Sequence, residues 1–383
     1  MLRLNKLYLI IIVITLMFIS SCVTMPPPEP PIESAVPTDK PTEQLPDSID
    51  QIADPIDQAP DVHDESPETK QLELSPSSRL TYTVAGDSVI ITGYSGEDKD
   101  LIIPNEIEGK SVAYIGDEAF FECDDLTSVT IPSSVTSIGD SAFSDCSSIT
   151  SIIIPDSVNK IGLAAFAGCS SLTSITIPEG VKSIEPVTFV GCTSLTDIVI
   201  PGSVGYIYRF AFASCTNLLS VTFSEGIIYI VDDAFASCTS LTSVEIPASV
   251  IGIDPGAFTE CFNLTSINVA QNNAVYASYD GVLFNKDKTD LINYPYGKKG
   301  AYTIPNSVTT INDWAFSGCV GLTSLTIPDS VTNIGYNVFS AVVNQEGEEV
   351  AGPSSENLTV ICSNGSYAQE YCEENGINYK FSL

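Results

Sequence analysis

Residues 142–162 read Ala-Phe-Ser-Asp-Cys-Ser-Ser-Ile-Thr-Ser-Ile-Ile-Ile-Pro-Asp-Ser-Val-Asn-Lys-Ile-Gly, and near copies of this stretch follow one another along much of the chain. Cysteine marks the period, because seven cysteines follow one another at intervals of 23 residues: Cys123, Cys146, Cys169, Cys192, Cys215, Cys238 and Cys261. A fixed period of roughly 20 to 29 residues is typical of solenoids, in which each repeat forms one coil that stacks on its neighbours. The sequence therefore predicts a β-rich solenoid with long exposed surfaces.

The apolar residues keep fixed places in each copy and indicate how one coil is built. Ile152 and Ile154 lie two residues apart, so both side chains point to the same face of a strand. Pro155 has no N–H to donate and therefore ends that strand. A second short extended piece and a tight or single helical turn complete the coil. Each Ile, Val, Leu or Phe buried between stacked coils contributes about 1.5–3 kcal/mol, so neighbouring coils stabilise one another.

The cysteine column takes an interior position of the repeat. Strands of adjacent coils lie about 4.8 Å apart, so distance alone does not forbid disulfides. We nevertheless expect buried, reduced thiols, because a free cysteine in such a column acts as a small hydrophobe. Zinc sites need pairs of ligands two to four residues apart, and the column has no such pair, so we expect no metal and no cofactor.

The period breaks once, between Cys261 and Cys319. The spacing of these two cysteines exceeds two full periods by about half a coil, which indicates an insert in one repeat. We place the insert within 270–300. Alternating apolar residues predict a β-hairpin over 276–296, with its turn near 285–288.

Both ends of the array carry different patterns that predict caps. Residues 80–110 form the N-terminal cap, where two alternating runs flank Gly86-Asp87 and predict a hairpin. The array occupies 111–340, and 341–383 is the C-terminal cap. There Ser366 is a candidate N-cap for a helix over 366–375 that Gly376 ends, with strands expected at 357–362 and 377–381.

The chain before the N-terminal cap predicts an export signal and a spacer. Residues 1–21 begin with Arg3 and Lys6 and continue as an apolar run, as in a signal peptide. Ile-Ser-Ser-Cys22 resembles a bacterial lipobox, which implies cleavage before Cys22 and its lipid modification; an ordinary signal peptide with an incidental cysteine is the alternative. Residues 22–79 are rich in proline and acids and contain no aromatic residue, which predicts a disordered stalk.

The repeat Cys-x-x-Leu-x-x-Val-x-Ile-Pro-x-x-Val-x-x-Ile-Gly-x-x-Ala-Phe resembles the BspA-like class of leucine-rich repeats, over residues 101–340. The resemblance implies a β-rich leucine-rich-repeat solenoid, a right-handed stack of coils with short helical turns. Members are surface or secreted proteins of host-associated bacteria and some protozoa, and some are reported as adhesins. The resemblance transfers no ligand, because the class shares no binding motif residue by residue.

Composition argues against most catalytic chemistry. The single histidine, His63, lies in the stalk, which removes Ser-His-Asp and Cys-His catalysis from the folded domain. A net charge of −33 makes nucleic acid a poor partner. Carboxylate pairs such as Asp124 and Asp125 leave a carbohydrate-active enzyme as a distant alternative, although adjacent acids on a turn do not face each other across a cleft. We therefore expect no enzyme.

Two surfaces follow the strands of the coils as candidate binding sites. The outward positions of the first strand form a flat ladder of serine and threonine, such as Ser128 and Thr130, which also simply suits an exposed sheet. Near the second strand, three successive coils replace small residues by larger ones. This tyrosine stripe is predicted to be exposed and consists of Tyr206, Tyr208, Arg209, Ile228, Tyr229, Val231 and Ile251. Packing against another part of the chain, or drift of the repeat, is its alternative.

The insert is the third candidate surface, because it combines aromatic and basic residues on an acidic domain. Its alternative role is a structural brace across the coil. The candidate residues are Tyr276, Tyr279, Lys286, Lys288, Tyr294 and Tyr296.

Together these patterns predict a lipid-anchored protein of the bacterial surface or outer envelope. We expect its solenoid to bind a protein, with adhesion to host or matrix proteins as the first hypothesis. An envelope-assembly or structural lipoprotein that binds a partner in the same envelope is the alternative. Membrane contact would pass through the N-terminal lipid, and the sequence does not determine the oligomeric state.

Overall fold

The computed structural model describes residues 79–340, 342–343, 349–351 and 358–382. The expected signal peptide, Cys22 and all of the stalk except Arg79 lie outside the described residues, as does much of the start of the expected C-terminal cap. The described residues all fall within one compact unit, Pro67–Asn344 with Glu348–Leu383.

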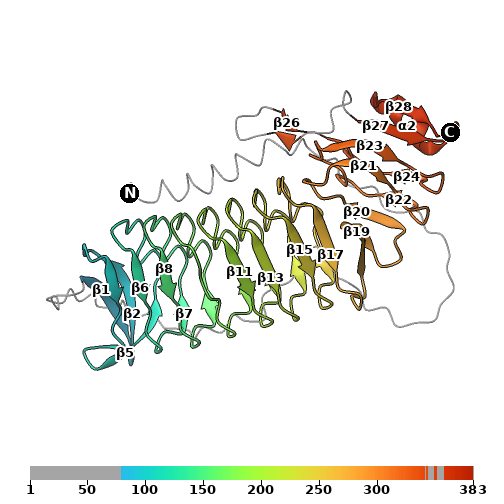
Figure 1. Cartoon of the computed structure of the whole chain (residues 1–383). Coiled ribbons are helices and arrows are strands. Elements are labelled where there is room, and N and C mark those ends of the chain that lie inside the picture. Colours follow the sequence, from blue (N-terminus) through green and yellow to red (C-terminus); the bar gives the residue numbers. More distant parts are fainter. Residues whose placement is uncertain (1–78, 341, 344–348, 352–357, 383) are drawn as a thin grey trace, which may run out of the picture. The chain divides into compact units, whose positions relative to one another are not determined.

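The N-terminal cap begins with the expected hairpin. β1 (Leu80–Ala85) pairs antiparallel with β2 (Ser88–Tyr94), and Gly86 makes the turn with φ 59°. β2 then pairs in parallel with β5 (Lys110–Ile115), which pairs antiparallel with the short β4 (Glu106–Ile107). The hairpin therefore closes the first end of a sheet that the coils extend (Figure 1).

Each coil contributes a strand to one or both of two rows of parallel strands, the first and second ladders, each of which is divided into separate hydrogen-bonded sheets. The first ladder contains β3 (Asp100–Ile102), β6 (Ser128–Thr130), β8 (Ser151–Ile153), β11 (Asp197–Ile200), β13 (Ser220–Phe223), β15 (Ser243–Ile246) and β17 (Ser266–Val269). The second contains β7 (Ser137–Ile138), β9 (Lys160–Ile161), β10 (Ser183–Ile184), β12 (Tyr206–Ile207), β14 (Tyr229–Ile230) and β16 (Gly252–Ile253). Within the array, paired strands of successive coils are in register at an offset of one repeat, so Ser183 pairs with Tyr206 and Tyr206 with Tyr229.

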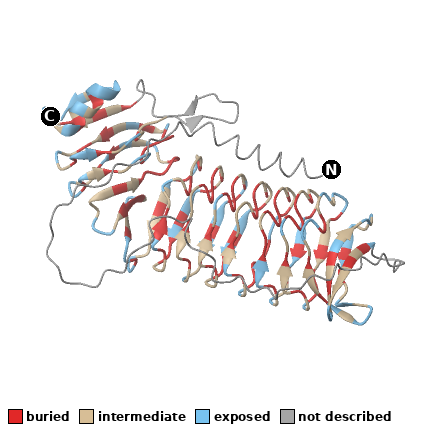
Figure 2. Ribbon diagram, turned by 180° about the vertical axis from the view of Figure 1, so that it is seen from behind, coloured by how far each residue is buried: buried red, intermediate tan, exposed pale blue. Residues whose placement is uncertain are grey.

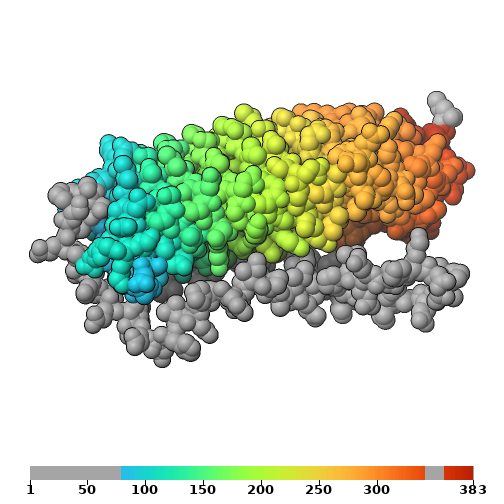
Figure 3. Space-filling model, turned by 90° about the horizontal axis from the view of Figure 1, so that it is seen from below, coloured from blue at the N-terminus to red at the C-terminus, as the bar shows by residue number. Residues whose placement is uncertain are grey.

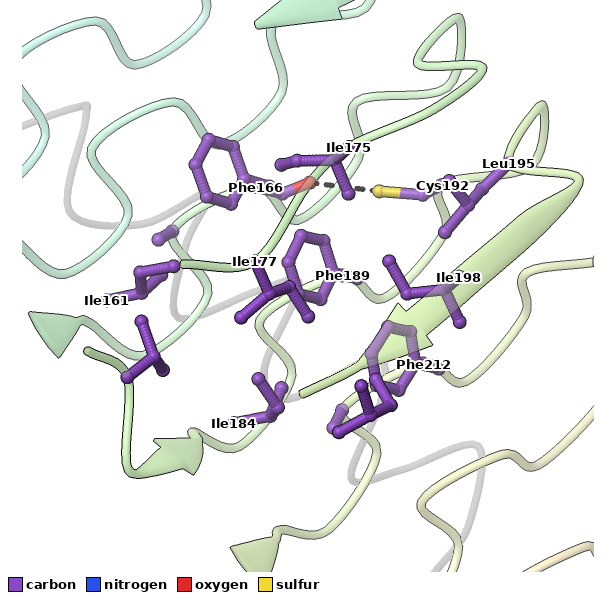
Figure 4. Close-up of a cluster of buried hydrophobic side chains, with 14 of the residues drawn as sticks. Ile161, Phe166, Ile175, Ile177, Ile184, Phe189, Cys192, Leu195, Ile198 and Phe212 are labelled. Carbon is purple, nitrogen blue, oxygen red and sulfur yellow. Dashed lines mark hydrogen bonds between the residues drawn. The ribbon is translucent and has the colours of Figure 1, made fainter. Parts of the chain in front are cut away.

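A phenylalanine ladder and the cysteine column fill the interior of the coils. The rings of Phe166, Phe189 and Phe212 stack with centroids 5.5 and 5.1 Å apart (Figure 4). The buried thiol of Cys192 donates a hydrogen bond of 3.3 Å to the carbonyl of Phe166 in the preceding coil. The same contact recurs from Cys146 to Cys261, and the column is buried as the sequence predicts except at Cys123, which is half-buried. Figure 2 shows this buried interior running through the coils.

The insert is a three-stranded meander. β18 (Tyr276–Tyr279), β19 (Val282–Asn285) and β20 (Asp290–Asn293) pair antiparallel in that order. The expected turn near 285–288 joins β19 to β20, and a further turn at Asp280 and Gly281, which the sequence interpretation missed, joins β18 to β19. β20 pairs in parallel with β22 (Thr310–Ile311), so the next coil adds its strand to the sheet of the insert.

The coils then continue into the C-terminal cap. β21 (Gly300–Thr303), β23 (Leu322–Thr326), β27 (Thr359–Cys362) and β28 (Tyr379–Phe381) form one parallel sheet, β24 (Asn333–Ile334) pairs with β22, and β25 (Val342–Val343) pairs with β26 (Glu349–Ala351). The predicted helix is α2 (Tyr367–Asn375), with Ser366 accepting from the N–H of Gln369 and Gly376 at φ 66°. In the described part of the chain no helix is long and apolar enough to span a membrane.

Candidate functional site

The second ladder brings the tyrosines of the stripe together on the outer side of the coils, where Tyr206, Tyr208 and Tyr229 are half-buried and not exposed as predicted. In β12 the side chain of Ile207 is buried, so Tyr206 and Tyr208 on either side of it point outward. The rings of Tyr206 and Tyr229 stack at 5.7 Å with an interplanar angle of 3°, and those of Tyr206 and Tyr208 at 6.0 Å and 15°. Three nearly parallel tyrosine rings therefore form a row that the backbone register sets.

Aliphatic side chains and one glycine complete the row. Ile228 and Val231 are half-buried, and Ile251 is 44% exposed. Gly252 follows Tyr229 in the ladder, and a Cβ at this position would overlap the Tyr229 ring. The absence of a side chain at 252 therefore lets the ring of Tyr229 lie against the next coil. The coils succeed one another along the solenoid in sequence order, as Figure 3 shows, so the three contributing coils are neighbours.

Arg209 is not the free anchor that the sequence suggested. Its guanidinium pairs with Asp232 at 3.5 Å and with Asp233 at 3.0 Å, and it lies 4.9 Å from the centre of the Phe210 ring. Burial raises the pKa of Asp233 to about 6, and the charge of Asp232 adds to the rise, while Arg209 opposes it. Arg209 thus serves first to compensate carboxylates of the next coil.

The insert is largely the brace that the sequence left as its alternative. Tyr276, Tyr294 and Tyr296 are buried, so they are wrong as residues of an exposed surface. Tyr294 takes the place of a ladder phenylalanine, because its ring lies 5.0 Å from that of Phe316 and its carbonyl accepts from Cys319 at 3.4 Å. The hydroxyl of Tyr276 accepts from the N–H of Ile253 and ties the insert to the second ladder.

The lysines of the insert are also engaged within the chain. Lys286 donates to the carbonyls of Gln271 and Asn273. The ammonium of Lys288 lies 5.7 Å from the ring centre of Tyr279, which is the one insert tyrosine of the prediction that is exposed. These contacts leave little of the predicted basic and aromatic surface.

The hydroxyl ladder on the strands of the first ladder also carries exposed apolar side chains. Ile102, Ile153 and Val199 stand where other coils have threonine and are 75%, 62% and 56% exposed. Their partners across the ladder are small, as in the pairing of Ile153 with Thr130. This face offers spread β-branched side chains without an aromatic row.

An exposed aromatic pair outside the stripe escaped the sequence interpretation. Trp314 and Tyr336 are 39% and 62% exposed, and their rings meet edge to face at 6.2 Å. The repeat period could have predicted this pair, because Trp314 and Tyr336 lie almost one full repeat apart in successive coils. Within the described ranges, no group of three or more His, Cys, Asp or Glu side chains could hold a metal ion.

The interior thiols have no chemical role at this surface. Burial raises the pKa of the Cys215 thiol to about 12 and that of Cys192 well above its ordinary value. The thiolate is the reactive form of cysteine, so these side chains are inert packing residues.

Stacked coils, parallel ladders and an interior phenylalanine and cysteine column define a leucine-rich repeat solenoid with an aromatic row on one face. The chain belongs to the BspA type leucine-rich repeat family, because the model of the BspA type leucine rich repeat region matches six copies over residues 99–208, 182–297 and 299–364. A search of curated proteins found no match.

Solved structures agree with this assignment. A leucine-rich cell surface protein from Faecalibacterium prausnitzii is 28% identical, with a TM-score of 0.61 over 83% of this chain and 96% of that one. A leucine-rich repeat protein from Bacteroides ovatus is also 28% identical, with a TM-score of 0.58 over 76% of this chain and 71% of that one.

Proposed function

We propose that this protein is a bacterial cell-surface binding protein that holds a protein partner on the tyrosine stripe and so mediates adhesion to host or matrix proteins. The observation that carries the proposal is the stacked row of Tyr208, Tyr206 and Tyr229 on the outside of adjacent coils. Tyrosine is enriched among the residues that contribute most to protein interfaces. The three rings already pack against one another, so their side chains lose little conformational entropy when a partner covers them.

The export signal, the lipid at Cys22 and the stalk belong to the same proposal. They would present the solenoid away from a bacterial membrane. Its similarity to the Faecalibacterium prausnitzii cell surface protein supports a surface location. The alternative role in envelope assembly differs only in where the partner resides.

A pull-down separates these roles and tests the stripe. The full-length chain, purified in a mild detergent, is exposed to host extracellular proteins and to the producer's own envelope extract. The Tyr206→Ala/Tyr229→Ala variant should lose the specific partner, while Trp314→Ala/Tyr336→Ala, which removes an exposed aromatic pair outside the stripe, should keep it. A host matrix protein as the partner supports adhesion, and an envelope protein supports assembly. Full binding by the Tyr206→Ala/Tyr229→Ala variant, with its fold intact, would refute the stripe as the site.

A further inference from the structure

Negative charge is concentrated at one end of the tyrosine stripe. Asp232 and Asp233 share the single guanidinium of Arg209, and the N–H of Asp232 donates to a carboxylate oxygen of Asp254 at 2.9 Å. Two carboxylates thus pair with one cation, and the negative charge of a third, Asp254, lies close enough to raise the pKa of Asp232. The side chain of Asp233 is 11% exposed, but that of Asp232 is 44% exposed, so part of the uncompensated charge is open to solvent.

These carboxylates continue the apolar columns of the stripe. Asp254 follows Tyr208 and Val231 at the offset of one repeat, so it is the third outward side chain of the same column. Asp232 adjoins Val231 in the chain. With coils about 4.8 Å apart, the carboxylates lie one coil step from the apolar residues that a partner would cover.

The electrostatics of the site and those of the whole domain both favour a positively charged partner. Burial raises the pKa values of Asp232 and Asp233, and Asp254 raises that of Asp232 further, so an added cation nearby would stabilise the ionised forms. Residues 80–383 hold 10 basic and 35 acidic residues, a net charge of −25. Such a field attracts cationic partners and repels acidic ones.

Basic residues mark the opposite end of the stripe. Lys160 lies two coils before Tyr206 in the second ladder. Lys182 lies directly before β10, in the coil that precedes that of Tyr206. Both are exposed. A cation placed on this face is therefore repelled at the Lys160 end and attracted at the Asp254 end.

We propose that the partner of the stripe is a protein segment that carries arginine or lysine next to an apolar or aromatic residue. The cationic group lies over Asp232 and Asp254, and the apolar residue lies against Tyr206 and Tyr229. This assignment rests on the proposed function and adds the chemistry and the orientation of the partner. Arginine suits the site well, because a planar guanidinium can bind a carboxylate and stack on a tyrosine ring at once.

The experiment uses a phage-displayed library of random dodecapeptides, selected on the immobilised full-length chain. We expect enriched peptides to pair Arg or Lys with Tyr, Trp, Phe or Leu. A synthetic enriched peptide should bind the Asp232→Asn/Asp254→Asn variant about 10-fold more weakly than the parent chain, and raising the salt concentration should weaken its binding to the parent. The matched control, Lys160→Gln/Lys182→Gln, should bind at least as well as the parent.

Each other outcome overturns the proposal. Enrichment of acidic or uncharged peptides, absence of any enriched peptide, or full binding by the Asp232→Asn/Asp254→Asn variant would each reject a cationic partner. The Tyr206→Ala/Tyr229→Ala variant separates this failure from that of the proposed function. If it loses the peptide while the aspartate variant keeps it, the stripe binds but the charge assignment is wrong. If both variants keep the peptide, both proposals fail.

Discussion

The ring of Tyr229 lies against the backbone of Gly252 so closely that any side chain at 252 would overlap it. Gly252→Ala should therefore push the ring out of the stacked row and weaken partner binding by about 10-fold, the loss typical of one displaced anchor residue. Gly205→Ala is the matched control, because its Cβ would meet Ile228 at an ordinary 3.7 Å. Binding titrations of both variants test this prediction. Equal affinities would show that the position of the Tyr229 ring does not affect partner binding.

Asp233 should make the protein more stable as the pH falls from 7 to 4. Its pKa in the folded chain is about 6, above the ordinary 3.8, because burial and Asp232 disfavour the ionised form. The folded state therefore keeps a proton in this window that the unfolded state releases, and this stabilisation is lost as the pH rises through 6. Asp233→Asn should raise the free energy of unfolding by about 1–3 kcal/mol at pH 7.

The same variant should have almost no effect near pH 4, where both states of the parent carry the proton for much of the time. Denaturant unfolding at the two pH values measures the difference. The backbone does not oppose the change, because residue 233 has φ 57° and asparagine tolerates this left-handed conformation well. Destabilisation of Asp233→Asn at pH 7 would mean that the ion pair with Arg209 outweighs the burial cost.

The cysteine column should resist thiol reagents until the protein unfolds. Burial raises the pKa values of its thiols, and the reagent needs an accessible thiolate. In a Cys22→Ser background, an aromatic disulfide reagent at pH 8 should label Cys123 first, because its side chain is only half-buried. Cys123→Ser should remove that early phase. Fast labelling of Cys192 or Cys215 in the folded chain would show that the coils open locally.

Repeat length explains why the sequence predicts so much of this fold. Coils of equal length that stack in parallel must place residues one period apart side by side, so the pairing of Tyr206 with Tyr229 follows from counting alone. The C-terminal helix was also predictable, because Ser366 and Gly376 satisfy its exposed ends through local hydrogen bonds.

Counting residues by the repeat period fails where the period changes or where the backbone conformation of a turn determines a side-chain contact. Tyr294 falls one position short of a full period before Phe316, so the insert concealed its place in the phenylalanine ladder and its burial. Arg209 could have been assigned to Asp232, which follows it by one full period. The shorter contact of Arg209 with Asp233, however, depends on the left-handed backbone conformation of residue 233, which the pattern of side chains does not predict.

Two buried tyrosines of the insert should respond in opposite ways to loss of their hydroxyl groups. Among the described residues the hydroxyl of Tyr294 has no hydrogen-bond partner, so Tyr294→Phe should leave stability unchanged or raise it by about 1 kcal/mol. The hydroxyl of Tyr276 accepts from the N–H of Ile253 at 3.0 Å, and Tyr276→Phe leaves this buried donor unpaired. It should lower the free energy of unfolding by about 1–3 kcal/mol. Unfolding of both variants in guanidinium chloride compares them directly, and a loss of stability in Tyr294→Phe would contradict an unsatisfied hydroxyl at this position.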